Sequence, residues 1–404
     1  MSTVAGRQDF DPHDPEYALN PWEHFKRLRA ECPVSHSDRY DGGFWILSKY
    51  EDVKAVSLDP ERFSSDGDLM VPSTHMGWKL LPIQCDPPLT TEYRRVINHV
   101  FHVRAVRELE PLVRRWTVEA IDGFSERGTC DLVPELAYPV PAKVTTHLMG
   151  WPVDEWETVL HAIKDFTTRA PDEPERAEAL GGVESLRARV IENVELRRHE
   201  RGDDLASHLL AAEVEGRPLT RDEIVGVMMM VIFGGVDTTV ASIGNMLHYL
   251  DLDRELRSKL IADPALIPAA VEELLRYEPP IQGFARIPTR PCVLGGEKIP
   301  AGEKVLMLFG SANHDEDVFE SPGEVRIDRP SNPHLTFGVG VHRCQGATLA
   351  RMELRVVLEE VLRRIPDYRI RHDEVVHTHT AGTIFERLSL PATFAPRPQL
   401  DSAA

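Results

Sequence analysis

The sequence is poor in cysteine, with five in 404 residues, and no two of them are close together. There is no C-x-x-C pair and no cluster of the kind that binds zinc. The spacing argues against disulfides and is typical of a protein from a reducing compartment. The five positions are Cys32, Cys85, Cys130, Cys292 and Cys344.

Basic side chains and long apolar runs are also scarce. Lys and Arg number 46 against 65 Asp and Glu, so the formal net charge is −19, and neither nucleic acid nor an anionic membrane is a natural partner. The N-terminus has no apolar signal-peptide core. The longest uncharged apolar run covers residues 224–236, which is too short to cross a bilayer. We therefore expect a cytoplasmic protein without a membrane anchor.

The composition that is present, 42% hydrophobic and 27% charged, is that of a globular protein with a large core. Residues 85–278 read as a helix-rich body, and residues 280–330 as short β-like pieces separated by Gly and Pro. Further β-rich parts are expected at 34–50 and in the tail at 370–395. We expect one domain over residues 1–404, mainly α with a smaller β region.

Caps and periodicity predict the individual elements. Residues 1–20 are expected to form an extended arm, with Asn20 as the N-cap of the first helix. Residues 66–84 are punctuated by Gly and Pro and rich in Met, as in an irregular loop with a function. A hairpin is expected in the tail, around LSLPATF. The other predictions are helices at 21–31, 50–58, 154–168, 183–198, 221–250 and 346–365, and a strand at 44–48.

Residues 337–346, FGVGVHRCQG, place Cys344 in a glycine-rich loop at the start of an amphipathic helix. Position alone leaves two interpretations open. Free cysteine is often a buried structural residue. A thiol at a helix N-terminus also has a lowered pKa, which suits a metal ligand or a nucleophile.

The predicted helix at 221–250 is about 45 Å long and apolar on all sides at its centre. That centre nevertheless contains five residues that are costly in an apolar helix: Gly234, Gly235, Asp237, Thr238 and Thr239. The Thr238 hydroxyl can bond the Gly234 carbonyl and bend the helix, which favours a small-molecule and proton-transfer site. The alternative is a glycine groove for a crossing helix, with Asp237 in a salt bridge.

Glu273 and Arg276 lie one helical turn apart in VEELLRYEPP. The pair is weak evidence alone, because Glu-x-x-Arg is common on solvated helix faces.

Taken together and in this order, the three segments resemble the cytochrome P450 family, the heme-thiolate monooxygenases. The matching positions of the cysteine signature are Phe337, Gly338, Gly340, His342, Cys344, Gly346, Leu349, Ala350, Arg351 and Glu353. Those of the central helix are Gly234, Gly235, Asp237, Thr238 and Thr239. Arg329 matches the arginine that completes a structural ion network with Glu273 and Arg276.

The resemblance implies heme b, held between the long central helix and the cysteine-loop helix. Cys344 would be the proximal thiolate ligand of the iron. Thr90 is a departure, because many members have a propionate-binding histidine there. The implied cofactor-binding residues are Cys344, His342, Arg94, Arg286, Phe337, Gly338, Gly346 and Gly234.

The resemblance also implies an activity, the insertion of one oxygen atom from O2, with Asp237 and Thr238 managing protons. Alternatives are desaturation, oxidative coupling, demethylation or peroxide-driven oxidation on the same scaffold, a heme sensor or carrier, and a protein without heme. We expect a small or medium-sized, neutral hydrophobic substrate. The expected pocket residues are Met70, Trp78, Met230, Phe233, Ile281, Phe284 and Ile384.

Electrons would come from NAD(P)H through a reductase and a ferredoxin or flavodoxin, as in soluble bacterial members. Most such carriers are acidic, so a basic docking surface over the cysteine loop is expected. The alternative is a set of scattered surface arginines. The candidates are Arg95, Arg104, Arg107, Arg343 and Arg355.

Overall fold

The computed structural model describes residues 8–382 and 384–398. Its α-helices are α1 Pro15–Leu19, α2 Pro21–Glu31, α3 Tyr50–Leu58, α4 Leu89–Phe101, α5 Val103–Asp122, α6 Pro139–Leu148, α7 Trp156–Thr167, α8 Arg176–His199, α9 Leu205–Ala211, α10 Arg221–Gly235, α11 Asp237–Leu252, α12 Arg254–Ala262, α13 Ile267–Tyr277, α14 Phe309–Ala312 and α15 Ala347–Arg364. Its strands are β1 Val34–Ser37, β2 Phe44–Leu47, β3 Phe63–Ser64, β4 Thr129–Asp131, β5 Glu213–Val214, β6 Arg217–Pro218, β7 Gly283–Pro288, β8 Cys292–Leu294, β9 Glu297–Ile299, β10 Lys304–Leu308, β11 Arg369–Ile370, β12 Val376–His377, β13 Arg387–Ser389 and β14 Pro391–Thr393.

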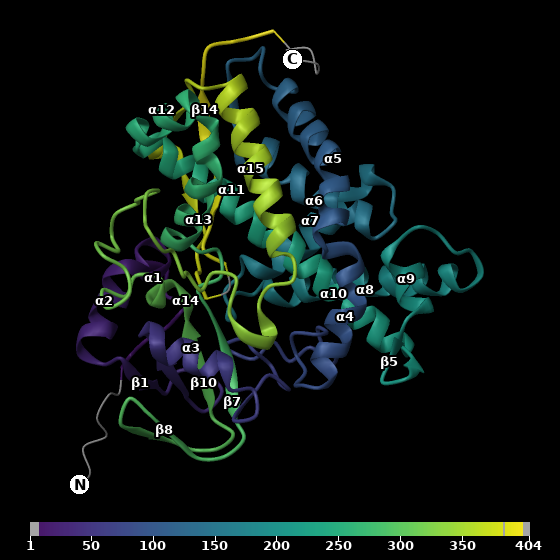
Figure 1. The fold of residues 1–404 in the computed structure, drawn as a ribbon, viewed down its shortest axis with the longest axis vertical. Helices are drawn as coiled ribbons and strands as arrows, with labels where there is room; N and C mark the ends of the chain where they lie inside the picture. The colour runs from purple at the N-terminus through teal and green to yellow at the C-terminus, as the bar shows by residue number, and fades with distance from the viewer. Residues whose placement is uncertain (1–7, 383, 399–404) are drawn as a thin grey trace.

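The molecule has a large helical body with a smaller sheet at one end (Figure 1). Helices α11 and α15 cross the middle of the body, and the sheet lies below them beside α2 and α3. This arrangement confirms the prediction of a mainly α protein with a smaller β region.

The first helices test how well caps predict boundaries. Helices α2 and α3 begin and end where the sequence predicts. The expected extended arm is wrong in part, because α1 forms within it. There the Asp14 side chain accepts the Glu16 N–H, and Pro15 occupies the first turn. The Asn20 side chain makes no capping hydrogen bond to α2.

The start of α8 is a second correction, since it begins at Arg176 rather than at residue 183. The sequence prediction treated Gly181 and Gly182 as the end of an interruption. Both lie inside the helix, and a Cβ atom on Gly182 would be 3.9 Å from the Ala162 Cα atom of α7. That is an ordinary van der Waals distance, so Gly182 lies in the contact between the two helices without being required by it.

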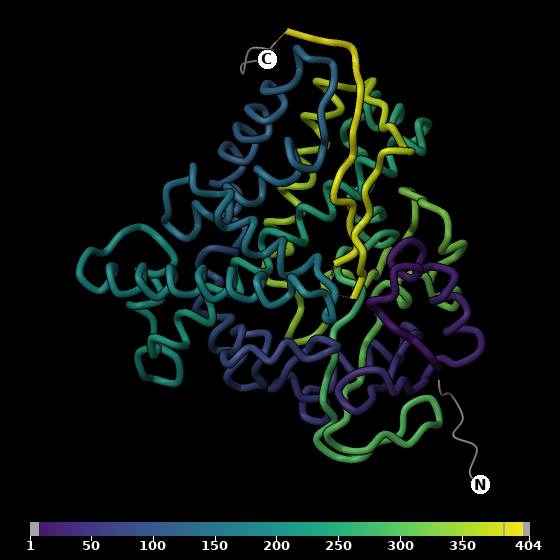
Figure 2. The backbone as a smooth tube through the Cα atoms, turned by 180° about the vertical axis from the view of Figure 1, so that it is seen from behind, coloured from purple at the N-terminus to yellow at the C-terminus, as the bar shows by residue number. Residues whose placement is uncertain are grey.

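The main sheet has five strands in the order β1-β2-β10-β7-β3. Strand β10 is parallel to β2 and antiparallel to β7, and all five of its residues are buried. The predicted hairpin in the tail is confirmed in part: β12 and β13 form an antiparallel pair within the tail, whereas β14 pairs with β11 and β4. Figure 2 shows, from behind, the tail running along the helical body.

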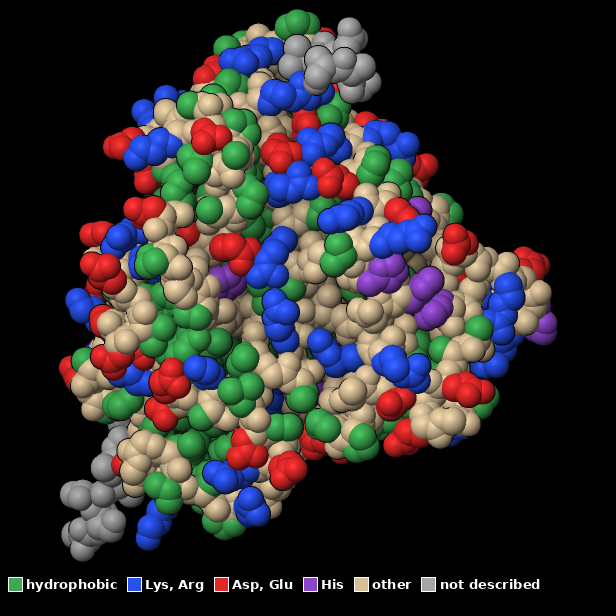
Figure 3. All heavy atoms as spheres, viewed as in Figure 1, with side chains coloured by type: hydrophobic (Ala, Val, Ile, Leu, Met, Phe, Trp, Pro, Cys, Tyr) green, Lys and Arg blue, Asp and Glu red, His purple; other side chains and the backbone are tan. Residues whose placement is uncertain are grey.

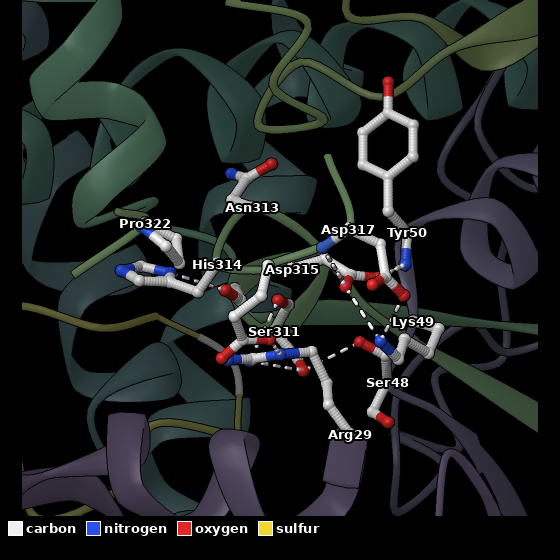
Figure 4. Close-up of polar contacts among 12 residues, drawn as sticks. Arg29, Ser48, Lys49, Tyr50, Ser311, Asn313, His314, Asp315, Asp317 and Pro322 are labelled. Atoms are coloured by element: carbon white, nitrogen blue, oxygen red, sulfur yellow. Dashed lines mark hydrogen bonds and ion pairs between the residues drawn. The ribbon is translucent and has the colours of Figure 1, made fainter. Parts of the chain in front are cut away.

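The segment after α14 attaches the N-terminal helices to the sheet (Figure 4). The N-terminus of α3 has no side-chain cap of its own. Instead, the Asp315 carboxylate accepts the Tyr50 N–H at 2.8 Å and contacts Lys49 Nζ at 3.0 Å. Arg29 of α2 donates to the Ser311 carbonyl at 3.2 Å. Residues far apart in sequence thus fix α2 and α3.

The predicted single central helix is interrupted. Helix α10 ends at Gly235 and α11 begins at Asp237, with Val236 at φ −89° and ψ −70° between them. Together, Arg221–Leu252 is long and apolar enough to cross a membrane by length and composition alone. However, 72% of its most apolar stretch is buried inside the protein, as in a core helix.

Candidate functional site

One cavity brings together the motifs that lie far apart in the sequence. Its lining includes the break between α10 and α11, part of the loop at 66–84, the start of β7 and the cysteine loop. Every residue predicted to bind the cofactor lines it: Cys344, His342, Arg94, Arg286, Phe337, Gly338, Gly346 and Gly234. Asp237 and Thr238 line it as well.

The cysteine loop depends on glycine at two positions. Gly338 and Gly340 have φ values of 63° and 76°, in the left-handed region that favours glycine. A Cβ atom on Gly340 would also come within 2.8 Å of the Ser57 carbonyl. The loop is closed by the Cys344 N–H, which donates to the Phe337 carbonyl at 2.7 Å.

Cys344 lines the cavity, and its side chain is exposed to the open space there. Burial raises its pKa, whereas the Gly346 N–H and the Arg94 charge act in the opposite direction. The groups that favour a thiolate are therefore already in place, and a cation bound to the sulfur would complete the ionisation.

Three nitrogen-bearing side chains of the cavity lack an anionic partner among the described residues. Arg286 is buried and donates a hydrogen bond to the carbonyl of Ala285. Burial lowers the pKa of the Arg286 guanidinium to about 10. Arg94 donates to the Arg343 carbonyl at 2.7 Å. His342 Nε2 is buried without a hydrogen-bond partner, and burial, with Arg286 and Arg94, lowers the pKa of His342 to about 3. The two guanidinium groups without an anionic partner, one of them buried, fit a ligand with acidic groups, such as the two propionates of heme, and the neutral His342 ring can donate a hydrogen bond to such a ligand.

Thr90 does not join this group. Its side chain is fully buried, and the hydroxyl donates to the Pro82 carbonyl at 3.1 Å.

The predicted bend of the central helix is confirmed at its hydrogen bond. Thr238 Oγ1 donates to the Gly234 carbonyl at 2.8 Å. A Cβ atom on Gly235 would be 2.8 Å from Thr145 Oγ1 of α6. Gly235 therefore also admits a crossing helix, as the alternative interpretation of this segment expected.

Asp237 is held by α7, and no hydrogen bond joins its carboxylate to the Thr238 hydroxyl among the described residues. Lys164 Nζ lies 2.8 Å from Asp237 Oδ1, and the Thr167 hydroxyl donates to Asp237 Oδ2. Lys164 also forms an ion pair with Glu386 of the tail. All three charged side chains are at most 7% exposed. The salt bridge that the alternative interpretation expected is thus present inside the site.

The two carboxylates share one ammonium group. Burial raises the pKa of Glu386 to about 7, and the Lys164 charge opposes that rise. Burial also disfavours the charged form of Lys164, but Asp237 and Glu386 outweigh it and raise its pKa. The lysine therefore stays charged, and near neutral pH a proton can reside on Glu386.

Sequence reasoning missed Lys164, Thr167 and Glu386. Lys164 and Thr167 are one helical turn apart in α7 and so share a face. That spacing is common on solvated helices, and nothing in the sequence marks this lysine as buried. Glu386 directly follows two apolar residues of the tail, a position that carries no signal for an ion pair.

The predicted ion network is confirmed. Arg276 is fully buried and donates to Glu273 at 2.7 and 2.9 Å. Arg329 Nε donates to Glu273 Oε1 at 2.8 Å. The remaining Arg276 donors bond the carbonyls of Asn313, Pro322 and Glu324. The network fixes α13 to the chain that precedes the cysteine loop.

Six of the seven predicted pocket residues line the cavity: Met70, Met230, Phe233, Ile281, Phe284 and Ile384. Trp78 does not line the cavity. Its indole N–H donates to Glu184 of α8 at 2.7 Å. It ties the loop at 66–84 to α8 instead.

The face that carries α15 and α4 bears many Lys and Arg side chains, with Asp and Glu among them (Figure 3). Several of the predicted docking arginines have acidic partners nearby. Arg95 lies 3.0 Å from Glu92, and Arg104 lies 3.0 Å from Glu108. Arg355 pairs with Glu110 and Glu359. Arg343 is exposed.

A cysteine facing an apolar cavity with unpaired cations, opposite a broken helix, defines a heme-thiolate protein. Comparison with known proteins agrees. The family model "Cytochrome P450" matches residues 155–366. Cytochrome P450 130 of Mycobacterium tuberculosis is 35% identical over 384 residues, covering 92% of this chain and 94% of that protein.

A second relative, the steroid C26-monooxygenase of Mycolicibacterium smegmatis, is 33% identical over 377 residues, covering 93% and 92% of the two chains. The structure of CYP109E1 from Bacillus megaterium in complex with testosterone is similar with a TM-score of 0.85 and 30% identity, covering 94% of this chain and 99% of that one.

The chain belongs to the cytochrome P450 family. It has the fold of the family and is a monooxygenase that uses heme.

Proposed function

We propose that this monooxygenase inserts one oxygen atom from O2 into a small or medium-sized hydrophobic molecule, using electrons from NAD(P)H. One observation carries the proposal: the Cys344 thiol, arginines without an anionic partner and the bent central helix all line one cavity. In the bent helix, the Thr238 hydroxyl donates to the Gly234 carbonyl, and its lone pairs remain free to accept a hydrogen bond. When bound, heme supplies the oxygen chemistry. The side chains hold the heme, orient the substrate and manage protons.

Cys344 is the proposed iron ligand, and Gly338 and Gly340 give its loop the required backbone path. His342, Arg94 and Arg286 are proposed to bind the heme propionates. Their support is the absence of an anionic partner among the described side chains, together with their place in the cavity that Cys344 lines. Phe337, Gly346 and Gly234 are proposed to border the heme.

Thr238 and Asp237 are proposed to manage protons on the substrate side. Thr238 Oγ1 uses its own hydrogen to bond the Gly234 carbonyl, so its lone pairs are free to accept a proton donor in the cavity. Asp237 is held by Lys164 and Thr167, and must loosen that contact before it can exchange a proton with the cavity. Glu386 would keep Lys164 paired when Asp237 does so.

A hydrophobic substrate fits the apolar part of the lining, which is mostly Phe, Leu, Ile and Met. The polar residues of the loop at 66–84 that line the cavity, Asp68, Thr74 and Gln84, have hydrogen-bond partners within the loop. For example, the Asp68 carboxylate accepts the N–H groups of Met70, Thr74 and His75. They are therefore not available to bind a polar substrate group without first breaking a bond.

The proposed electron donor is a ferredoxin or flavodoxin with an NAD(P)H reductase. Its docking surface would include the exposed Arg343, beside the cysteine loop. The carboxylates paired with Arg95, Arg104 and Arg355 reduce the net positive charge there. We therefore expect a weak, salt-sensitive complex. A single domain and a cytoplasmic location are part of the same proposal.

A substrate screen tests the function. Neutral apolar compounds, steroids among them, would be titrated into the purified heme-loaded protein while the high-spin spectral shift is recorded. The compounds that give the shift would be incubated with NADPH, a ferredoxin and its reductase. We expect a product heavier by one oxygen atom, with the label when 18O-labelled O2 is used. A product labelled only from water or from added peroxide would contradict the proposal.

A further inference from the structure

A buried histidine of the N-terminal arm joins two irregular segments that border the cavity. His13 lies just before α1 and is 9% exposed. Its Nε2 atom is 2.8 Å from the Val71 carbonyl, and its Nδ1 atom is 2.7 Å from Thr380 Oγ1. Val71 and Thr380 are 309 positions apart in a chain of 404 residues, so one ring bridges two distant segments.

The two hydrogen bonds fix the state of the ring. A carbonyl oxygen can only accept, so Nε2 carries the hydrogen and donates it to Val71. Nδ1 is then unprotonated and accepts from the Thr380 hydroxyl. Burial lowers the pKa of His13, which is consistent with a neutral ring.

Both segments contribute to the cavity wall next to the contact. Leu69 and Met70 precede Val71, and Ile384 follows Gly382; all three apolar side chains line the cavity. Both segments are irregular, and each has a backbone contact with the sheet region: the Leu69 carbonyl accepts the Ala285 N–H of β7 at 2.8 Å, and Ile384 forms an isolated bridge with Ile281. Their position therefore depends on individual contacts such as those of His13.

The packing around the ring is equally close. A Cβ atom on Gly382 would lie 2.3 Å from the His13 Cε1 atom, so the tail backbone rests directly on the ring. The arm itself is secured, because the Asp11 carboxylate accepts the His13 N–H at 2.8 Å and the Tyr40 hydroxyl at 3.0 Å. The His13 ring is thus held in place by its own contacts, and both segments pack against it.

We infer that His13 is a positioning residue, which sets the separation of the loop at 66–84 and the tail at 378–382 and so shapes the substrate side of the cavity. The inference rests on the proposed function only in naming this side as the substrate's. The bridge itself is a feature of the fold.

Four variants separate bridging from simple space filling. His13→Ala removes both hydrogen bonds, and His13→Gln keeps one donor and one acceptor on a side chain of similar reach. Thr380→Val removes one of the two bonds. His161→Ala, at an exposed position of α7, is the matched control.

Hydrogen–deuterium exchange of residues 69–76 and 378–382 is the first readout. We expect His13→Ala to speed exchange in both segments by about fivefold to tenfold, since each segment loses one hydrogen bond. Thr380→Val should affect chiefly the tail, and His13→Gln should restore most of the protection. Unchanged exchange in His13→Ala, or no rescue by His13→Gln, would overturn the inference.

The second readout is the affinity for phenylimidazole, an apolar heme ligand, measured by its spectral shift. We expect the dissociation constant to be about fivefold to tenfold higher in His13→Ala than in the parent. In His13→Gln it should stay within about twofold of the parent value. The reduced carbon monoxide spectrum should be the same in all variants. Equal affinity in His13→Ala and the parent contradicts the role in shaping the cavity. A parent protein without a thiolate-type spectrum would instead refute the proposed function, and the exchange result on His13 would still stand.

Discussion

Lys164 Nζ lies 2.8 Å from Asp237 Oδ1, and both side chains are buried. The pair joins α7, which forms part of the cavity wall, to the first residue of α11. It also leaves Glu386 on the other side of the lysine. The proposed proton-handling acid is therefore part of a three-residue ion cluster, whose stability and pH dependence can be measured separately from activity.

Replacing Lys164 with Met should destabilise the fold strongly. The change leaves Asp237 and Glu386 as two buried carboxylates without a cation, and breaking a buried pair in this way costs about 3–5 kcal/mol. Urea unfolding measures the loss. Lys259→Met is the control, because Lys259 pairs with Glu255 at 2.8 Å on the exposed surface, and this change should alter the free energy of unfolding very little. Equal effects of the two changes would count against a buried cluster.

Because Glu386 is buried, we expect the free energy of unfolding to depend on pH. The pKa of Glu386 in the folded protein is raised to about 7 from an ordinary value of 4.5. The stability associated with its proton is thus fully present below pH 4.5 and is lost as the pH rises through 7. In Glu386→Gln this loss should disappear, on the order of 3 kcal/mol between pH 4.5 and 8. Parallel stability curves for the parent and Glu386→Gln would show that the proton is not held there.

The Gly235 position tests the close approach of α6. In Gly235→Ala the new Cβ atom would be 2.8 Å from Thr145 Oγ1, so we expect a loss of about 1–3 kcal/mol from overpacking. The double variant with Thr145→Ala should recover that loss. Gly181→Ala is the control, since nothing lies within 4 Å of its Cβ position and helix propensity alone should stabilise it by about 1 kcal/mol. Thermal unfolding of the four proteins gives the comparison.

Arg286 should have opposite effects on the heme-free and heme-bound protein. Without an anionic partner, its buried charge is unfavourable, so Arg286→Leu should stabilise the heme-free chain to urea. The same change should speed heme loss to a heme scavenger by about tenfold or more, because a propionate loses its cation. Slower or unchanged heme loss would contradict the proposed propionate contact.

Thr238→Ala should leave heme binding largely intact and divert reducing equivalents to hydrogen peroxide. The expected change is a severalfold rise in peroxide formed per NADPH consumed, with a compound from the substrate screen present. Thr146→Ala is a matched control, because the Thr146 hydroxyl makes the same bond to the residue four positions earlier, at 2.7 Å. If Thr238→Ala releases no more peroxide than the parent, or if Thr146→Ala releases as much as Thr238→Ala, then Thr238 has no special part in proton delivery.

Much of the fold could be predicted where local signals decide it. Helices α2 and α3 have the predicted bounds because proline and the hydrophobic pattern mark them. The predicted start of α8 is wrong, because Gly181 and Gly182 are weak helix formers that nevertheless lie inside the helix, which begins at Arg176. The tail hairpin is predicted correctly for β12 and β13 but not for β14, whose partners include β4, far away in the sequence. Sequence proximity carries no information about them.

The sequence predicts those residues of the site that belong to a recognisable motif. Cys344, Thr238 and the Glu273 network stand in patterns that specify their neighbours. Lys164 and Glu386 belong to no such pattern, and only the packing of α7 against the tail brings them to Asp237. Trp78 was assigned to the pocket as an apolar residue of the loop, whereas its indole N–H makes a polar contact with Glu184 outside it.

The most direct test of the central claim is the absorption spectrum of the reduced carbon monoxide complex. We predict the red-shifted Soret band of a thiolate-ligated heme for the parent protein and for Cys85→Ala, a control at a buried cysteine that does not line the cavity. Cys344→Ala should lack that band. Persistence of the thiolate-type band in Cys344→Ala, or its absence from the heme-loaded parent, would contradict the account.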